Sequence, residues 1–216
     1  MEKIEDKEGV GIFRRSDGRI YTVRHNRDRF FYPDEWMRFY DILKKNQKFL
    51  FNFLINTGAR IEEARHVKVE DIDLERRTII LRKTKVKAKK KETKPRPRTI
   101  PISSGFVKYL RRWTIKHNLQ DADYVIKTSK STSAANVALK KGLERAGVKD
   151  WIMFSVHNIR KTMEVWLMAL GIDGLRITAH LGHDIRTAVR HYVSPDIFSF
   201  DDKKKMRMIV GDLYSN

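Results

Sequence analysis

The stretch from Ser155 to Tyr192 constrains the fold most, because it predicts three consecutive helices that carry polar residues at fixed intervals. Ser155 is a favourable start for the first helix and Gly171 a favourable stop. Between them the apolar residues recur at helical spacing, at Ile159, Met163, Trp166, Leu167 and Leu170. Shorter helices are predicted over residues 174–181 and 185–192. This pattern is typical of a chain that folds around a mainly helical core.

Further helices are predicted earlier in the chain from the same kind of signal. Pro33, followed by two acidic residues, is a good helix start. A second helix, over residues 47–56, is apolar on most sides and is expected to be central, with Gly58 as its stop. The other predicted helices are a short one over residues 60–66 and two that would be capped by Ser104 and Ser133.

Runs of β-branched residues predict a small antiparallel sheet. Residues 78–82 and 98–102 flank a long basic loop, so we expect them to pair. Residues 66–72 could form another strand. Near the N-terminus, an Asp17-Gly18 turn between alternating residues indicates a β-hairpin. The expected fold class is therefore α+β and mainly α-helical, with a small three-stranded antiparallel sheet.

The balance of charge points to an anionic partner. Lys and Arg number 46 against 27 Asp and Glu, so the chain carries a formal net charge of +19. A field of this sign attracts polyanions and raises the rate at which they are encountered. Nucleic acid is the first candidate partner. An anionic membrane surface, or a charge that serves only solubility, is the plainer alternative.

Composition also limits the class of protein. A length of 216 residues suits one domain with a hydrophobic core, to which shorter segments could be attached. The chain has no cysteine, which excludes disulfides and thiolate metal sites. The first residues lack the apolar run of a signal peptide, and the longest apolar stretch, residues 49–55, is too short to span a bilayer. We therefore expect a soluble protein. A reducing cytoplasm fits the lack of cysteine and is the expected location, although other compartments would fit it too.

Two arginines from distant segments are candidate phosphate ligands. A guanidinium group binds two phosphate oxygens in its plane, which an ammonium group cannot do. Arg60 and Arg160 could therefore clamp one phosphate from two sides. Arg60 follows a glycine and lies near a predicted helix N-terminus, where backbone N–H groups also favour anions. Considered alone, Arg60 is better explained by a salt bridge to Glu63, one turn along, although Glu63 could equally orient its guanidinium.

Two histidines and a tyrosine accompany these arginines. His157 lies three residues before Arg160, so the two share a helix face, and a neutral imidazole can accept the proton of an attacking hydroxyl. His183 follows a Leu-Gly pair, and Tyr192 lies nine residues later. The phenol of Tyr192 is a potential nucleophile where cations stabilise its phenolate. Each residue also has a plainer reading, as a structural histidine or as an amphipathic tyrosine at a helix end.

The order and spacing of these residues resemble the catalytic domain of the tyrosine recombinases, also called phage-type integrases. The motifs are TGAR ending at Arg60, HxxR ending at Arg160, LGH ending at His183, and Tyr192. The resemblance covers about residues 33 to 195. It implies the tyrosine-recombinase catalytic fold, in an integrase of a virus, plasmid or other mobile element. The implied catalytic residues are Arg60, Lys83, His157, Arg160, His183 and Tyr192, supported by Glu63.

The resemblance also implies a mechanism and partners. Tyr192 would attack a DNA phosphate, form a 3′-phosphotyrosyl link and release a 5′-hydroxyl, with no metal, cofactor or ATP. Lys83 would protonate the departing oxygen, and Lys85 is the alternative for this role. The implied partner is double-stranded DNA at attachment-type sites. A homotetramer is expected on DNA, and the free state could be a monomer.

The basic loop between the two predicted strands is a candidate DNA-binding segment. Residues 82–98 contain ten Lys or Arg and one Glu, close to half of the net charge. A run this basic is often only solvated. Beside the catalytic Lys83, the residues expected to bind DNA are Arg82, Lys85, Lys87, Lys89, Lys90, Lys91, Lys94, Arg96 and Arg98.

The chain divides into three expected parts. Residues 1–32 form a basic arm with the predicted hairpin, residues 33–197 the catalytic domain, and residues 198–216 a tail that either packs on its own chain or docks on a neighbouring protomer. Two other functions remain open. One is a type IB topoisomerase, which relaxes supercoils by the same chemistry, and the other is a non-catalytic basic protein that binds nucleic acid.

Overall fold

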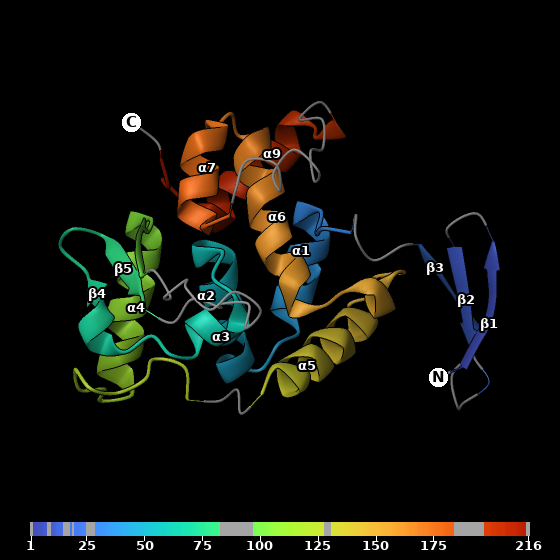
Figure 1. The fold of residues 1–216 in the computed structure, drawn as a ribbon, viewed down its shortest axis with the longest axis horizontal. Helices are drawn as coiled ribbons and strands as arrows, with labels where there is room; N and C mark the ends of the chain where they lie inside the picture. The colour runs from blue at the N-terminus through green and yellow to red at the C-terminus, as the bar shows by residue number, and fades with distance from the viewer. Residues whose placement is uncertain are drawn as a thin grey trace, which may run out of the picture.

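The expected class of fold is confirmed in a computed structural model that describes residues 2–7, 10–14, 18, 20–24, 29–82, 97–127, 131–183 and 197–214. The chain is mostly helical, with small antiparallel sheets (Figure 1). No helix in these ranges is long and apolar enough to cross a membrane. The helices are α1 (Pro33–Asp41), α2 (Lys45–Thr57), α3 (Ile61–Ala64), α4 (Ser104–Lys116), α5 (Thr132–Arg145), α6 (Val156–Ala169), α7 (Gly174–Leu181) and α9 (Phe200–Val210). The helix predicted over residues 185–192 lies outside the described residues.

Helix α2 is central, as its apolar sequence predicts. Its residues from Phe49 to Thr57 are buried, apart from Asn52, and it packs against α3, α6 and α9. Figure 1 shows α6 and α7 side by side, with α2 below them, so that α2 and α6 lie in the middle of the molecule and α7 at its upper edge. Gly58 ends α2 in the left-handed conformation with a φ of 56°, as predicted.

Helix α6 begins where predicted, at a Ser155 cap, and it anchors the segment that leads into α1. The indole N–H of Trp166 donates to the Phe31 carbonyl at 3.0 Å, and the Phe31 N–H donates to the Thr162 hydroxyl at 2.9 Å. These bonds satisfy the backbone of an extended segment that is fully buried at Phe31. Pro33 then occupies the first turn of α1, as predicted.

The starts of α4 and α5 differ from the prediction by one or two residues. Ser103, not Ser104, caps α4 and accepts a hydrogen bond from the Phe106 N–H at 3.2 Å. The Ser104 N–H is instead taken by the carboxylate of Asp212 at 2.7 Å. Ser131, not Ser133, caps α5, with its hydroxyl accepting from the Ala134 N–H at 3.1 Å. Adjacent serines offer equivalent caps, so contacts elsewhere decide which one is used.

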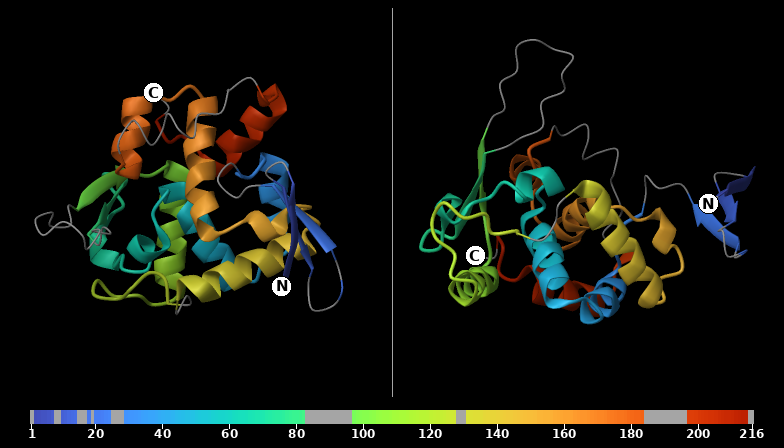
Figure 2. Two further views of the ribbon diagram at one scale, coloured as in Figure 1. Left: turned by 45° about the vertical axis from the view of Figure 1, so that its right-hand side comes forward. Right: turned by 90° about the horizontal axis from the view of Figure 1, so that it is seen from below.

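The sheet within the helical body consists of β4 (Ile72–Asp73), β5 (Thr78–Leu81) and β6 (Arg98–Pro101). The expected antiparallel pairing of β5 with β6 is confirmed, and it places Leu81 opposite Arg98. Figure 2 shows this sheet at one side of the molecule, beside α4. The hairpin therefore holds the two ends of the basic loop next to each other.

The strand expected over residues 66–72 is wrong for most of its length. Residues Val69–Asp71 form a 3₁₀ helix, and β4 holds only the last residue of the expected run. The backbone here bonds to a segment of the chain that the local pattern cannot reveal. Val69 N–H donates to the Asp123 carbonyl at 3.0 Å, and Val125 N–H donates to the Val67 carbonyl at 3.1 Å.

The N-terminal hairpin is part of a second three-stranded sheet. Strand β2 (Val10–Arg14) pairs antiparallel with both β1 (Glu2–Lys7) and β3 (Ile20–Arg24). The sequence predicted β2 and β3 but not β1. Figure 1 shows this sheet to one side of the helical body.

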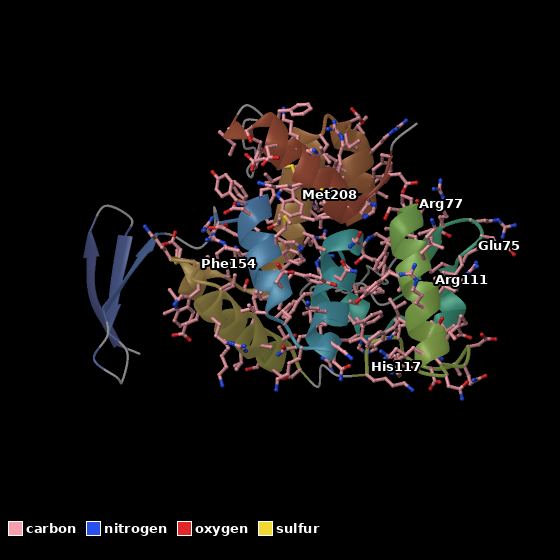
Figure 3. The ribbon with its side chains drawn as sticks, turned by 180° about the vertical axis from the view of Figure 1, so that it is seen from behind. Glu75, Arg77, Arg111, His117, Phe154 and Met208 are labelled. Carbon is pink, nitrogen blue, oxygen red and sulfur yellow. The ribbon has the colours of Figure 1, made fainter. Side chains whose placement is uncertain are left out.

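The C-terminal segment packs on its own chain. Helix α9 contacts α1, α2 and α6, and buries Met206 and Val210, while Met208 points outward (Figure 3). The carboxylate of Asp212 accepts from Arg77 at 3.0 Å in addition to its bond at the start of α4. Docking of this segment on a neighbouring protomer stays a prediction.

A buried histidine ties the same segment to the middle of the fold. His180, in α7, is 2% exposed, and its Nε2 lies 3.0 Å from the Thr57 carbonyl while its Nδ1 lies 2.8 Å from the Tyr214 hydroxyl. Because a carbonyl only accepts, Nε2 carries the proton and Nδ1 accepts from Tyr214. Burial, together with the charges of Arg98 and Arg160, lowers the pKa of His180 to about 4. His180 is therefore neutral at physiological pH.

A substitution at Gly142 can test how closely α5 packs on α1. A Cβ atom at this position would lie 2.6 Å from a ring carbon of the fully buried Phe39. Alanine improves helix propensity by about 1 kcal/mol, whereas overpacking a core costs about 1–3 kcal/mol. We expect Gly142→Ala to lower the free energy of unfolding by about 1 kcal/mol in urea titrations. Gly105→Ala is the control, because a Cβ there meets nothing within 4 Å; equal stability of the two variants would contradict the packing argument.

His180 predicts a pH dependence of stability. Its pKa of about 4 in the folded chain lies below its value of about 6.5 in an unfolded chain. Its contribution is complete above about pH 6.5 and is lost as the pH falls toward 4, because the unfolded state then binds a proton that the folded state excludes. Between pH 7 and pH 5 we expect wild-type to lose about 2 kcal/mol more than His180→Gln, which keeps one donor and one acceptor and does not titrate. Parallel losses in urea titrations at the two pH values would contradict this.

Candidate active site

Arg60 lies where three helices, α2, α6 and α7, approach one another closely. It is the N-cap residue of α3 and comes just after the turn that ends α2. A Cβ atom on Gly58 would lie 2.5 Å from Leu181 and 2.6 Å from Met163. Only glycine therefore allows the end of α2 to touch α6 and α7 here, and that contact brings Arg60 close to both helices.

Glu63 is the carboxylate around which the arginines gather. Its side chain is 1% exposed. It accepts from the Arg60 backbone N–H at 2.9 Å and from the Arg60 guanidinium at 2.9 Å, so the salt bridge considered from sequence is present. Arg98 adds two further bonds, at 2.9 and 2.7 Å. Burial alone would raise the pKa of Glu63, but the bonds and charges of Arg98 and Arg60 hold it below its usual value. Glu63 is therefore ionised.

Arg160 is the most deeply buried arginine among the described residues, at 4% exposed. One terminal nitrogen donates to the Gly58 carbonyl at 2.8 Å, and the other donates to the Leu181 carbonyl. Burial first, then the charges of Arg60 and Arg98, lower the pKa of Arg160 to about 9. The guanidinium thus remains charged at neutral pH, but in surroundings that favour a nearby anion.

The two histidines lie at different depths. His157 is exposed in the first turn of α6, three residues before Arg160. His183 follows α7, whose end is closed by Gly182 with a φ of 67°. Its Nε2 lies 3.4 Å from a carboxylate oxygen of Glu164, and the side chains are 11% and 5% exposed. Glu164 lies one turn along α6 from Arg160. Its charge acts on Arg160, and one of its oxygens lies close to His183.

The fold brings together several of the residues named from sequence. Arg60, Glu63, Arg160 and His183 come from α3, α6 and the end of α7, and all lie around the point where α2 meets these helices. His157 lies on the same helix as Arg160, at its exposed end. The remaining candidates lie outside the described residues: Lys83, Lys85, Lys87, Lys89, Lys90, Lys91, Lys94, Arg96 and Tyr192.

Two cations assigned to the basic loop are described, and both contact buried carboxylates. Arg82, whose side chain is 58% exposed, pairs with Asp71. Arg98 is 13% exposed and belongs to the site, through Glu63. From sequence, Arg98 was counted with the basic run although it is also the first residue of the strand predicted over residues 98–102. The predicted pairing of residues 78–82 with 98–102 was the available signal, since it puts Arg98 at the base of the hairpin, as the structure confirms.

Sequence analysis also overlooked Glu164 and His180. Glu164 lies four residues after Arg160, and this spacing on a helix is a signal that could have been read. No local signal marks His180, because its partners lie in α2 and at the C-terminal end. Within the described residues, no three His, Asp or Glu side chains meet in a way that could hold a metal ion.

The chemistry that this arrangement supports is the binding of a phosphate. Arg60, Arg98 and Arg160 contribute three positive charges, whereas Glu63 and Glu164 contribute two negative ones. Arg60 is the member of this group open to solvent, with a side chain 33% exposed. Guanidinium groups held in place by carboxylates and backbone carbonyls stabilise charge on phosphate oxygens without having to reorganise.

Curated relatives share part of this sequence. The chain is 24% identical over 176 residues to a protein named tyrosine recombinase XerA from Thermococcus onnurineus, covering 78% of this chain and 58% of the relative. It is 28% identical over 143 residues to tyrosine recombinase XerA from Pyrococcus furiosus, covering 65% of this chain and 47% of the relative. The chain thus spans about half of the length of these relatives.

Solved structures share the fold. A crystal structure of XerA recombinase superposes with a TM-score of 0.60 at 19% identity, covering 83% of this chain and 64% of the other. The Tn1549 transposon integrase in complex with transposon right end DNA gives a TM-score of 0.62 at 17% identity, covering 84% and 65%. The profile of the phage integrase family matches residues 29–197, which is most of the chain. The chain belongs to the phage integrase family.

Proposed function

We propose that this chain is a site-specific DNA recombinase, an integrase that cleaves and rejoins DNA through a 3′-phosphotyrosyl intermediate. The observation that carries the proposal is the cluster of Arg60, Arg98 and Arg160 around the buried Glu63. Such a cluster suits one phosphate group at the point where α2, α6 and α7 meet. Membership of the phage integrase family supports a phosphodiester as that group.

Cleavage begins with the phenol of Tyr192. Its oxygen attacks the scissile phosphorus, the bond from phosphorus to the 5′ oxygen breaks, and the DNA 3′ end becomes joined to the tyrosine. His157 takes the phenol proton, which its exposed position in α6 permits. Lys83, or Lys85 in its place, protonates the departing 5′ oxygen. The bond energy is kept in the phosphotyrosine, so the step needs no metal and no ATP.

The arginines stabilise the pentacoordinate phosphorus. Arg60 offers its solvent-facing nitrogens, while Arg160 is fixed by the Gly58 and Leu181 carbonyls. His183, backed by the carboxylate of Glu164, adds a third contact. These groups are in place before the phosphate arrives, so little reorganisation accompanies the build-up of charge.

Rejoining reverses the same step. The 5′-hydroxyl of the original strand, or one from a partner duplex, attacks the phosphotyrosine and releases Tyr192. Exchange between two duplexes requires four active sites, so we expect a homotetramer on DNA and a monomer in its absence. Tn1549 integrase, which shares the fold, was solved with transposon right end DNA, and this supports double-stranded DNA at attachment-type sites as the substrate. The activity would then take place in the host cytoplasm, at its nucleoid.

Tyr192→Phe tests the proposed nucleophile. Nicked duplexes of random sequence are incubated with the chain, and the strands that remain joined to protein after denaturation are recovered and sequenced. The nick lets the cleaved fragment diffuse away, so the adduct accumulates. We expect wild-type to enrich one family of sequences, whereas Tyr192→Phe yields no adduct and binds the enriched duplex with unchanged affinity, because it retains every cation.

Two further outcomes distinguish the alternative functions. Relaxation of supercoiled plasmid without exchange between two duplexes would favour a type IB topoisomerase. Equal recovery of DNA from wild-type and Tyr192→Phe would favour a non-catalytic basic protein. Arg76→Ala is the matched control, because Arg76 is exposed and pairs only with the nearby Asp73 among the ion pairs of the described residues.

The basic loop predicts a steep salt dependence of DNA binding. If six of its cations contact phosphates, the logarithm of the binding constant should fall with the logarithm of salt concentration with a slope of about −5. Alanine at Lys89, Lys90 and Lys91 should make this slope shallower by about 2.7. Fluorescence anisotropy at several salt concentrations measures it. An unchanged slope would mean that these lysines do not bind DNA.

A further inference from the structure

Arg98 differs from Arg82, the other described cation of the basic segment, in being largely buried, with a side chain 13% exposed against 58%. It lies at the first position of β6, opposite Leu81 of β5. Its two terminal nitrogens donate to the two oxygens of Glu63, and its Nε donates to the His180 carbonyl at 3.1 Å. The planar fork that would bind a phosphate is therefore already occupied by a carboxylate.

The bonds from Arg98 determine how the two oxygens of Glu63 are distributed between Arg98 and Arg60. One oxygen of Glu63 is shared between Arg60 and Arg98, and the other bonds to Arg98 and to the Arg60 backbone. Arg60 thus commits one guanidinium nitrogen to the carboxylate and keeps the rest of its guanidinium free of Glu63. If Arg98 were removed, Arg60 would be the remaining guanidinium partner of the buried Glu63 carboxylate among these contacts. Glu63 would then bind the Arg60 guanidinium more strongly.

Arg98 also packs against the turn that carries His183. A Cβ atom on Gly182 would lie 3.0–3.2 Å from the Cδ, Nε and a terminal nitrogen of Arg98. The glycine has a φ of 67°, so both its conformation and its lack of a side chain are used here. The Nε of Arg98 also donates to the carbonyl of His180, two residues before Gly182, and so holds the start of the same turn.

We propose that Arg98 is a positioning residue for phosphoryl transfer, which balances the charge of Glu63 so that Arg60 stays available to the phosphate and holds the Gly182 turn so that His183 faces it. The role rests on the proposed function. It removes Arg98 from the set of DNA-binding cations and gives it a task inside the active site. Because Arg98 acts through Arg60 and His183, its loss should affect the cleavage rate rather than the affinity for DNA.

The test uses the full chain and the nicked duplex enriched by wild-type. The rate of adduct formation is measured at saturating DNA, and the dissociation constant separately. We expect Arg98→Ala to form the adduct about 100-fold more slowly, because the reacting groups are misplaced. DNA affinity should change less than about threefold, because only one charge is lost. Arg76→Ala removes a charge from an exposed ion pair and should leave both quantities at the wild-type value.

A double variant separates positioning from simple structural support. In Arg98→Ala with Glu63→Gln, the carboxylate charge that captures Arg60 is gone, so the rate should rise at least about tenfold above that of Arg98→Ala, which corresponds to a barrier lower by about 1.4 kcal/mol. A merely structural role predicts a double variant no faster than Arg98→Ala. That result would overturn the proposal, as would a wild-type rate in Arg98→Ala itself.

If Arg98→Ala lacks a cooperative melting transition and so does not fold, Arg98→Lys is measured in its place. Lysine keeps the charge, but its single nitrogen cannot reach both oxygens of Glu63 and the His180 carbonyl together. We expect a rate about tenfold lower with unchanged DNA affinity, and a wild-type rate would reject the role. If wild-type forms no adduct on any duplex, the proposed function fails and the role of Arg98 with it. An adduct that is indifferent to Arg98 rejects the role of Arg98 alone.

Discussion

The ionised carboxylate of Glu63 is the group on which the site depends. It is buried, so it requires positive partners, and loss of one partner from such a pair costs about 3–5 kcal/mol. Arg60 reaches it from the same short helix and Arg98 from the hairpin, 35 residues along the chain. One carboxylate therefore fixes two guanidinium groups, and it links the start of α3 to the base of the basic loop.

Backbone carbonyls supply the rest of the frame. Gly58 and Leu181 present carbonyl oxygens to Arg160, while the carbonyl of His180 accepts from Arg98. The ends of two helices thus act as ligands for arginine, which is possible because the glycine at the end of α2 permits a contact that a Cβ atom would block. The pKa of Arg160, lowered to about 9 by burial and by neighbouring cations, reflects a site with more positive than negative charge. An added phosphate would relieve that imbalance.

Sequence patterns succeeded where local signals were strong. Helices α2 and α6 follow from apolar spacing between a start and a stop, and the β5–β6 pair follows from two β-rich runs around the loop. The failures share a cause. Residues 66–72 form a 3₁₀ helix and an isolated antiparallel bridge to Tyr124 in place of the expected strand, and Ser103 caps α4 while Asp212 accepts from the Ser104 N–H group. These partners are distant in sequence, and their geometry is absent from any local pattern.

The sequence by itself determined the order of the motifs, the excess of positive charge and the helices that carry Arg60 and Arg160, because these depend on residue type and spacing. Only the tertiary structure decided that Arg98 belongs with Glu63 and that His180 joins α7 to the C-terminal segment. Both contacts depend on the docking of elements that are far apart along the chain. A side chain at the base of a hairpin has the same local sequence whether it faces solvent or a buried carboxylate, and packing alone makes that choice.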